Sequence, residues 1–590
     1  MLSRWIWILI ALVCSSFNPE VDYRYPLNGH KVLAGTFGEL RPNHFHSGID
    51  IKTGGRSGKP VYAIQDGFVY RLKVSPYGFG NAVYLRHPDG RFSVYAHLSR
   101  FTPEMAGYIY QRQYTSKQFP QELYLGAREM PVKQGQLIGY SGNSGSSLAP
   151  HLHFEIRDPQ ERILNPLPYY SHLVSDNIPP IVQGVAIEPM TASSRVKGRF
   201  RKTLLKPTGG NGRYTVPAPI RISGLVGMEY RAYDLLNGAG NHCGINHTRL
   251  FLDGDLIFEL DLRKFSFDES RHINQHIDYS FYKKNKQRYE RAYVEEGNEF
   301  SGYKNLNNQG MIELYDNRLH SFLLELEDAY GNHTTISGKL IQETNDKPLA
   351  GSPGFREASK LIYEIKRNVL TVTLINPKTR HYDGLLYENQ YGDIQELLPS
   401  YRYQNRLVFL LPLRQGQYPV RVFDREERLQ KWTYLEEELQ PRRNGLVKMD
   451  DIQLFFPVGT AFQPTPLTLR KRPAQKGGLS PVYQVGEEQT PLFNSYLVNF
   501  AVPPMVDKNH VVIAYQEKGK WKYLGNSWGE NGNLYASTKY FGTFCLMADS
   551  IPPKIIPLNF KNYQTVPSSQ STLRIKLEDE FSGIDSEKIY

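Results

Sequence analysis

Short apolar segments separated by turn residues fill most of the chain between residues 24 and 170. Residues 61–65, 67–74, 82–87, 92–98, 137–145 and 151–158 each alternate or run apolar, and Asp-Gly, Tyr-Gly-Phe-Gly-Asn and His-Pro-Asp-Gly lie between some of them. A period of two, bounded by Gly, Pro, Asn and Asp, is typical of strands joined by tight turns. This region is therefore predicted to be nearly all-β.

The segment 99–131 departs from this strand pattern. Residues 104–123 lack the alternation and read Glu-Met-Ala-Gly-Tyr-Ile-Tyr-Gln-Arg-Gln at their start. We predict an insertion between two strands here, with a short helix inside it.

Proline-rich turns divide the rest of the chain. Residues 176–180 read Asp-Asn-Ile-Pro-Pro, residues 549–553 repeat this as Asp-Ser-Ile-Pro-Pro, and a Pro/Gly linker spans 345–355. Strand-plus-turn phrases at 233–241 and 327–334 resemble those of immunoglobulin-like sandwiches. The predicted fold class is all-β: an N-terminal antiparallel β-sheet domain over 22–172, then β-sandwich or β-rich modules over 178–345, 355–442 and 445–548, and the incomplete start of another immunoglobulin-like module over 549–590.

Composition supports strands and turns and excludes a disulfide scaffold. The 590 residues include 40 Tyr, 29 Phe, 49 Gly and 38 Pro, but only 3 Cys. Aromatic residues favour strands, whereas Gly and Pro favour turns. Because Cys243 and Cys545 fall in different predicted modules, we expect two free buried thiols.

The net charge of +11 is modest for a chain of this length. Positive and negative residues alternate, without a run of five or six like charges, so no nucleic-acid partner is expected. The distribution indicates an ordinary solvated surface. The alternative is attraction to an anionic polymer such as a cell envelope.

The first 17 residues are predicted to be a signal peptide. Arg4 precedes an apolar run from Trp5 to Val13, and small and polar residues follow at once. A membrane span needs ~20 apolar residues, so the run is too short for one. No later segment is apolar enough to span, and we expect no transmembrane helix after signal removal. Alternatively, lipidation of Cys14 would anchor the exported chain, although Val13 departs from the usual small residue before such a cysteine.

Five residues of the first β-domain could form a metal site. His151 and His153 are two apart on a predicted strand and share a face. His46 and Asp50 can both reach one ion from a loop that enters a strand, and His97 ends another strand. Catalytic zinc takes three protein ligands from His and carboxylate side chains. One histidine of the pair can bind metal while the other stays free to move protons.

These residues lie in motifs with a specific order. Residues 46–50 read His-Ser-Gly-Ile-Asp, 78–81 Gly-Phe-Gly-Asn, 87–90 His-Pro-Asp-Gly, 95–98 Tyr-Ala-His-Leu, 133–145 Lys-Gln-Gly-Gln-Leu-Ile-Gly-Tyr-Ser-Gly-Asn-Ser-Gly and 150–155 Pro-His-Leu-His-Phe-Glu. Together with Val-Tyr-Ala-Ile-Gln-Asp-Gly-Phe-Val at 61–69, this series resembles the lysostaphin/LytM-type zinc endopeptidases, which cut peptide bonds of bacterial peptidoglycan. The resemblance covers residues 35–168.

The resemblance implies a role for each site residue. His46, Asp50 and His153 would bind one Zn²⁺ per chain, and His97 and His151 would be the proton-transfer and oxyanion-stabilising groups. The implied protein is an exported peptidoglycan endopeptidase of the bacterial cell envelope, in the periplasm, that acts on stem peptides. Its C-terminal modules would act as spacers or bind envelope proteins.

Two further histidines are expected to lie outside the metal site, and the insertion has two possible positions. His87, in a hairpin turn, is expected to be structural, and His44 is not expected to bind the metal. The insertion either lies beside the substrate groove, with Tyr108, Tyr110 and Tyr114 against it, or faces solvent elsewhere.

Alternative functions remain at this stage. A non-catalytic relative that activates other wall hydrolases, an envelope-binding protein, or a surface-assembly protein with a vestigial enzyme domain would each keep the same fold.

Overall fold

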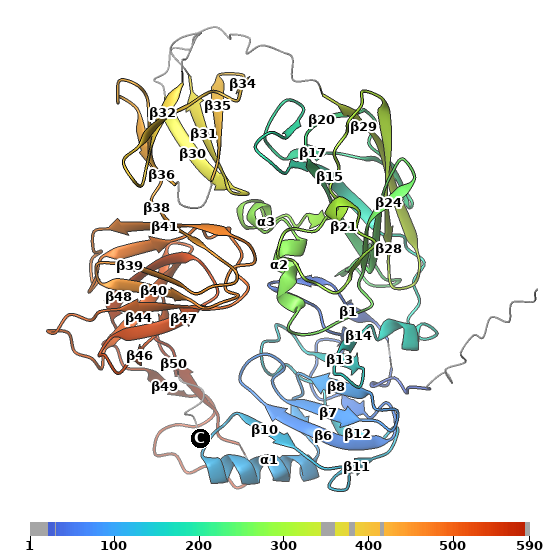
Figure 1. Cartoon of the computed structure of the whole chain (residues 1–590). Helices are drawn as coiled ribbons and strands as arrows, with labels where there is room; N and C mark the ends of the chain where they lie inside the picture. The colour runs from blue at the N-terminus through green and yellow to red at the C-terminus, as the bar shows by residue number, and fades with distance from the viewer. Residues whose placement is uncertain are drawn as a thin grey trace, which may run out of the picture. The chain divides into compact units, whose positions relative to one another are not determined.

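The computed structural model describes residues 22–29, 31–343, 360–376, 384–413, 418–570 and 572–584 (Figure 1). The chain divides into two compact units, one containing the described residues of 1–34 and 48–175, the other those of 35–47 and 176–589. The predicted signal peptide and Cys14 lie outside the described residues. Within the described residues, no helix has the length and apolar character needed to cross a membrane.

The first unit is built on one large sheet. Its strand order is β1-β4-β13-β8-β7-β6-β10, with β11 added against β6 and β14 against β13. The strands are β1 (Leu33–Gly35), β4 (Ile49–Lys52), β6 (Gly67–Val74), β7 (Ala82–Arg86), β8 (Phe92–Ala96), β10 (Gln121–Tyr124), β11 (Pro131–Val132), β13 (His151–Arg157) and β14 (Ile163–Leu164). A smaller sheet, β5-β12-β9, contains Pro60–Tyr62, Leu137–Tyr140 and Arg100–Phe101.

The centre of the large sheet carries the buried core of this unit. Strand β13 lies between β4 and β8, and Leu152, Phe154 and Ile156 on one of its faces are completely buried. Successive side chains of a strand point to opposite faces. His153 and Glu155 therefore occupy the other face, and they are buried as well.

The insertion forms helix α1 (Pro103–Ser116) between β9 and β10, which it contacts. Thr102 caps its first turn by accepting a hydrogen bond from the Met105 amide, and Pro103 stands at the first helical position. Both features favour a helix start. Met105 and Ile109 are buried beneath the helix. A 3₁₀ turn, η1 (Leu167–Tyr170), follows β14.

Two sheets make up the first module of the second unit. One has the order β17-β15-β21-β22, with β26 paired to β21: Ile181–Pro189 (β15), Thr203–Leu205 (β17), Val226–Leu235 (β21), His242–Cys243 (β22) and Glu290–Arg291 (β26). The other has the order β16-β20-β29-β28-β23-β24-β27, with β18 and β19 beside β29: Arg195–Val196 (β16), Thr208–Gly210 (β18), Arg213–Thr215 (β19), Ile220–Ser223 (β20), His247–Leu252 (β23), Asp255–Asp261 (β24), Tyr303–Lys304 (β27), Leu319–Glu327 (β28) and His333–Gln342 (β29).

Short helical segments and three short strands complete this module. They are η2 (Ser270–His272), α2 (Ile273–His276), α3 (Tyr279–Asn285) and η3 (Asn308–Gly310), with the short strands β2 (Leu40–Arg41), β3 (His44–Phe45) and β25 (Lys264–Phe265).

Residues 35–47 pack into the first module and not, as the predicted domain 22–172 implies, into a continuous N-terminal domain. The ring of Phe45 lies 5.0 Å from that of Phe300 and 5.7 Å from that of Phe265, and Phe37 lies 5.1 Å from Phe265. The Phe45 amide also donates to the Ser270 hydroxyl. These aromatic contacts between residues more than 200 positions apart are not visible in local patterns.

Two further two-sheet modules follow. The first contains β30-β31-β35-β34 and β33-β32-β36-β37: Lys360–Lys366 (β30), Val369–Ile375 (β31), Leu385–Asn389 (β32), Ile394–Leu397 (β33), Tyr401–Tyr403 (β34), Arg406–Pro412 (β35), Pro419–Phe423 (β36) and Gln430–Trp432 (β37). One buried cluster joins its sheets, as Leu370 and Val372 of one pack with Leu385 and Val422 of the other.

The second of these modules contains β38-β41-β42-β48-β44-β45 and β39-β40-β43-β47-β46: Leu435–Leu439 (β38), Gly445–Met449 (β39), Ile452–Phe456 (β40), Thr465–Arg472 (β41), Val482–Val485 (β42), Tyr496–Phe500 (β43), Val511–Glu517 (β44), Lys520–Gly525 (β45), Ser527–Trp528 (β46), Leu534–Thr538 (β47) and Gly542–Ala548 (β48). Because β38 pairs with β41, this module begins earlier than the predicted boundary at 442–445. A hairpin of β49 (Lys554–Pro557) and β50 (Ile575–Glu578) follows.

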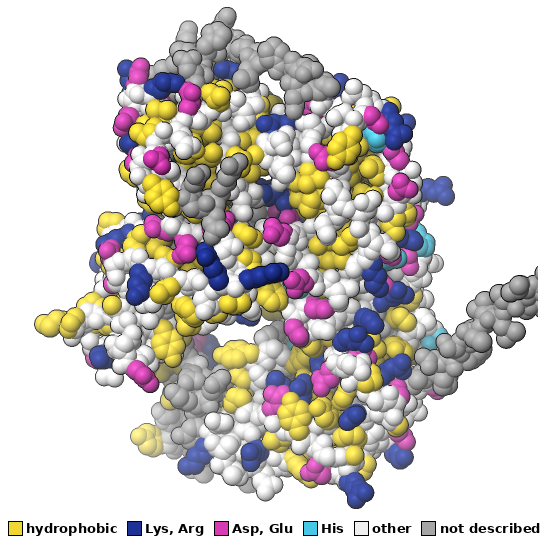
Figure 2. All heavy atoms as spheres, viewed as in Figure 1, with side chains coloured by type: hydrophobic (Ala, Val, Ile, Leu, Met, Phe, Trp, Pro, Cys, Tyr) yellow, Lys and Arg dark blue, Asp and Glu magenta, His cyan; other side chains and the backbone are white. Residues whose placement is uncertain are grey.

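The structure confirms the predicted all-β class, with α1 as the longest helix among the described residues. Cys243 and Cys545 are free and buried, as expected. Lys and Arg side chains are interspersed with Asp and Glu over the face shown in Figure 2.

Candidate metal centre and active site

The pairing of β4 with β13 places two of the predicted ligands directly opposite each other. In this antiparallel register His153 faces Asp50, and the His153 Nδ1 atom lies 3.0 Å from the Asp50 Oδ1 atom. One ligand atom each of His46, Asp50 and His153 lies within 4.8 Å of the other two, and all three side chains are buried. Two imidazoles and one carboxylate are a donor set that suits Zn²⁺.

Backbone carbonyls fix the tautomers of three site histidines. The Nδ1 atoms of His46, His97 and His151 lie 2.7, 2.9 and 2.8 Å from the carbonyl oxygens of Thr36, Ser144 and Ala149, respectively. A carbonyl oxygen only accepts hydrogen bonds, so each Nδ1 must carry the proton. In this tautomer Nε2 is the ring atom whose lone pair can bind a metal or accept a proton.

Glu155 orients the third ligand. The His153 Nε2 atom lies 3.0 Å from Glu155 Oε1, and Arg157 donates from Nε and Nη2 to the other oxygen of Glu155 at 2.8 and 2.6 Å. A carboxylate behind a metal-binding histidine fixes the ring and raises its basicity. Glu155 ends the Pro-His-Leu-His-Phe-Glu motif, two residues after His153 and on the same strand face, but the motif alone does not assign this role.

The surroundings of His153 favour a positive charge. Burial acts to lower the pKa of His153, but hydrogen bonds to Asp50 and Glu155 outweigh it and raise the pKa to about 9. The site thus already stabilises positive charge between two carboxylates. The residues present fit a zinc ion, with His153 Nδ1 facing Asp50 and Nε2 held by Glu155.

His97 sits in an uncommon backbone conformation directly after β8. Its φ is 59°, in the left-handed region that non-glycine residues rarely adopt. Its ring centroid lies 4.9 Å from that of His151 and 5.9 Å from that of His153. Burial, followed by the neighbouring charges of His153 and His151, lowers the pKa of His97 to about 4. His97 is therefore neutral at neutral pH.

His151 is the most accessible of the five residues. Its side chain is 17% exposed, against 4% for His153 and 7% for Asp50. Its Nε2 atom lies 3.3 Å from Asp50 Oδ1. His151 thus adjoins the ligand group and can still reach a substrate.

Two glycine-containing loops hold the Ser144 carbonyl against His97. A Cβ atom on Gly80 would lie 2.4 Å from the Ser144 backbone, and one on Gly145 would lie 2.4 Å from the Gly80 nitrogen. Residues 78–81 and 141–145 therefore approach each other backbone to backbone. This close approach explains why both motifs need glycine.

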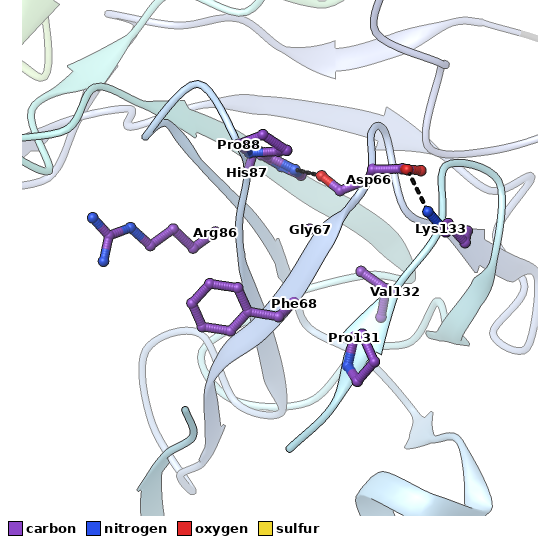
Figure 3. Close-up of a pocket in the computed structure, with 9 residues that line it drawn as sticks. All are labelled: Asp66, Gly67, Phe68, Arg86, His87, Pro88, Pro131, Val132 and Lys133. Carbon is purple, nitrogen blue, oxygen red and sulfur yellow. Dashed lines mark hydrogen bonds and ion pairs between the residues drawn. The ribbon is translucent and has the colours of Figure 1, made fainter. Parts of the chain in front are cut away.

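His87 and His44 lie outside the group of candidate ligands. His87 is buried, with Nδ1 2.9 Å from the Asp66 carbonyl and Nε2 2.8 Å from the Ser93 hydroxyl. It lines a cavity of about 440 Å³ together with Asp66 and Lys133, which form an ion pair at 2.8 Å (Figure 3). None of the five predicted site residues lines this cavity. His44 is exposed and does not belong to the ligand group.

The tyrosines of the insertion face solvent. Tyr108, Tyr110 and Tyr114 are 40, 59 and 84% exposed. Helix α1 contacts β9 and β10 on its inner side. The three rings are therefore exposed on the surface of the insertion.

Comparison with known proteins identifies two regions. Residues 44–117 and 121–166 match the family model described as Peptidase family M23, and residues 436–549 match the Zu5-like domain. The first match contains all five predicted site residues. The second coincides with the module that begins at β38.

Curated relatives share the first region. The chain is 36% identical over 112 residues to DD-carboxypeptidase/endopeptidase Mpg of Neisseria meningitidis serogroup B, covering 19% of this chain and 20% of the relative. It is 33% identical over 157 residues to an uncharacterized metalloprotease of Haemophilus influenzae (27% and 25%) and 34% identical over 111 residues to lysostaphin of Staphylococcus simulans (19% and 17%). The chain thus spans about a sixth to a quarter of the length of these relatives, and it contains a LytM-type M23 peptidase domain.

Proposed function

We propose that this M23 domain is an active zinc endopeptidase that hydrolyses peptide cross-links of bacterial peptidoglycan. The observation that carries the proposal is the group of His46, Asp50 and His153, whose ligand atoms lie within 4.8 Å of one another. Two more histidines adjoin this group: His151 Nε2 lies 3.3 Å from Asp50 Oδ1, and the His97 ring centroid lies 5.9 Å from that of His153. A non-catalytic relative would not need this complete set.

Some residues of the chain would hold the zinc ion, and others would transfer protons. Bound zinc would supply Lewis acidity, lowering the pKa of a water and polarising the scissile carbonyl. Of His97 and His151, one would accept the proton of the attacking water at Nε2, and the other would stabilise the developing oxyanion or pass a proton to the leaving amine. Glu155 would keep the His153 ring in place throughout.

The names of the relatives support the proposed substrate and location. Mpg is named a DD-carboxypeptidase/endopeptidase, and a relative from Vibrio cholerae, 29% identical over 139 residues, is named peptidoglycan DD-endopeptidase ShyA. We infer a substrate in peptidoglycan stem peptides and, with the predicted signal peptide, export to the cell envelope. The sandwich modules would position the enzyme or bind envelope proteins.

The direct test is digestion of purified peptidoglycan by the mature protein. Zinc is determined on the same sample, and the released muropeptides are identified by mass. One zinc per chain with loss of cross-linked dimers is expected. Bound zinc without cleavage would reject peptidoglycan as the substrate, and neither zinc nor cleavage would favour the activator alternative.

Two variants separate ligand from proton-transfer roles. His153→Ala should abolish both bound zinc and activity because it removes a ligand. His151→Ala should keep zinc and lower the turnover rate by roughly 10²–10⁴-fold, the usual contribution of a positioned acid or base. Equal zinc loss in the two variants would contradict this assignment within the pair.

A further inference from the structure

Three acidic residues from distant parts of the sequence meet at one end of the first sandwich module. Asp176 lies in the Asp-Asn-Ile-Pro-Pro turn before β15, Asp234 stands near the end of β21, and Asp328 directly follows β28. One carboxylate oxygen of each lies within 4.8 Å of the other two. The strand-plus-turn phrases found in the sequence thus supply two of the carboxylates, and the first proline turn supplies the third.

No basic side chain among the described residues forms an ion pair with this group. A second acidic group provides the contrast: Glu188, Glu229 and Asp278 also lie within 4.8 Å of one another, but the ammonium groups of Lys202 and Lys366 lie against them. Buried carboxylates need such compensation, because an unpaired buried charge is strongly unfavourable. The group of Asp176, Asp234 and Asp328 lacks it.

Unpartnered polar atoms point to a missing ligand at the same place. Asp234 is only 2% exposed, and its Oδ1 atom is buried with no hydrogen-bond partner among the described residues. The Tyr330 hydroxyl is likewise buried without a partner. Burial and then the charges of Asp176 and Asp328 raise the pKa of Tyr330, so this hydroxyl lies beside the same carboxylates.

The loops around the group are already organised by hydrogen bonds. Asp328 Oδ1 accepts hydrogen bonds from the Tyr330 and Asn332 amides at 2.8 and 2.9 Å, and Asp176 Oδ1 accepts one from the Ile178 amide at 3.1 Å. The Asn332 side chain bridges Asp176 and Asp328 at 3.3 and 2.7 Å. Hydrogen bonds therefore hold two of the three carboxylates, those of Asp176 and Asp328, in place.

The donor chemistry distinguishes between cations. Cys243 lies opposite Asp234 in the β21–β22 pair, but burial raises the pKa of its thiol to about 12, so it stays protonated and is a poor metal ligand. Only oxygen donors remain, which hard cations prefer. Calcium accepts irregular sets of oxygen ligands, whereas magnesium requires a near-ideal octahedron and keeps several waters.

We propose that Asp176, Asp234 and Asp328 bind one Ca²⁺ ion that joins the two sheets of this module to the segment leading into it. In the absence of the cation, burial and the neighbouring charges of Asp328 and Asp176 raise the pKa of Asp234 to about 8. The ion replaces this unfavourable crowding with attraction. It stabilises the folded module and is separate from the zinc centre.

The Asp-Ser-Ile-Pro-Pro turn at residues 549–553, which is similar to the Asp-Asn-Ile-Pro-Pro turn at 176–180, provides a natural control. Asp549 accepts a hydrogen bond from the Ile551 amide, and Asp579 accepts hydrogen bonds from the Phe581 and Gly583 amides, as in the first module. Among the described residues, however, no third carboxylate joins Asp549 and Asp579 in a metal-competent group. This pair alone is not expected to bind calcium.

The test is calcium titration of the zinc-loaded full-length protein by calorimetry and by thermal unfolding. We expect one high-occupancy Ca²⁺ per chain and, at about 100-fold excess over the dissociation constant, an increase of roughly 5–10 °C in the melting temperature of one transition. Absence of binding heat and of any shift at about 10 mM Ca²⁺, well above the ~1 mM limit of extracellular calcium sites, would overturn the proposal. An equal shift with Mg²⁺ would overturn the assignment to calcium.

Asp234→Asn tests the group itself. It should weaken calcium binding at least tenfold, yet in a calcium-selective chelator it should melt no lower than the wild type, because the neutral amide removes the electrostatic crowding with Asp176 and Asp328. Asp549→Asn should retain the wild-type calcium shift. A wild-type shift in Asp234→Asn would contradict the site. Because the readouts are calcium binding and melting, the result does not depend on peptidase activity.

Discussion

At the scale of single residues, each histidine of the candidate site is oriented by the group that accepts a hydrogen bond from its ring. The Thr36, Ser144 and Ala149 carbonyls hold Nδ1–H of three histidines, whereas the Glu155 carboxylate holds His153. A carboxylate makes its imidazole more basic than a carbonyl does. His153 is therefore the ligand whose metal affinity depends most on its supporting partner.

Glu155→Gln is expected to lower zinc affinity about 10–100-fold, because the amide no longer provides a negative charge behind His153. Zinc competition assays measure this change. Glu161→Gln is the matched control, since Glu161 is the other carboxylate near Arg157, at 3.4 Å, and its side chain is 44% exposed. If both variants bound zinc like the wild type, Glu155 would have no orienting role.

Zinc affinity is expected to rise with pH. Because the pKa of His153 is raised to about 9, zinc must displace a proton below that pH, and the apparent affinity should increase up to about tenfold per pH unit between pH 7 and 9. The same shift stabilises the metal-free fold fully below pH ~6.5, the unfolded value, and this contribution is lost as pH rises through about 9. A zinc affinity independent of pH over this range would contradict the assignment.

At the scale of elements, the site depends on the register of three strands. His153 pairs with Asp50 on β4 and with Ala96 on β8, the residue before His97. A slip by one residue would move His153 to the opposite face of the sheet. Gly48 protects this register, because a Cβ atom there would lie 2.2 Å from the Phe154 carbonyl oxygen.

Gly48→Ala should therefore displace β4 from β13, lower the melting temperature and reduce zinc affinity by more than tenfold. Thermal unfolding and zinc titration report both effects. Gly107→Ala in α1 is the control: a Cβ atom there meets nothing within 4 Å, and alanine should stabilise the helix by about 0.5–1 kcal/mol. Unchanged zinc affinity in Gly48→Ala would show that the register tolerates this contact.

Elements were predicted from the sequence with unequal success. The strands of the first domain and the helix within 99–131 follow from period and turn residues, and the structure contains both. The predicted boundary near 442–445 lies after β38, whereas β38 joins the following sheet through pairing with β41, about 30 residues later. Local pattern identifies a strand but not the sheet that accepts it.

At the scale of the whole molecule, the two later sandwich modules of the second unit each contain a buried cluster, and Leu435 of β38 packs with the cluster of the preceding module. The cluster around Leu454, Tyr496 and Phe544 involves only residues 439–546, and the one around Leu370 and Leu385 only residues 361–435. No residue of the zinc group belongs to either cluster. Stability of these modules is therefore expected to be independent of zinc.

Removal of zinc should consequently abolish peptidase activity while these modules remain folded. A zinc-selective chelator, used in the presence of about 1 mM calcium, isolates this effect from the proposed calcium site. Circular dichroism and calorimetry should show the β signal and the later thermal transitions unchanged. Cooperative loss of all transitions on zinc removal would refute this independence.

The sequence by itself determined the all-β class and the peptidase-like region and indicated five candidate site residues, because ligand spacing and glycine-bearing turns are local and their order is specific. Tertiary structure decided the rest. It placed Glu155 behind His153, packed residues 35–47 against Phe265 and Phe300, and brought Asp176, Asp234 and Asp328 together. Each of these depends on strand register or on contacts between side chains far apart in the chain, and neither is encoded in the periodicity of a single segment.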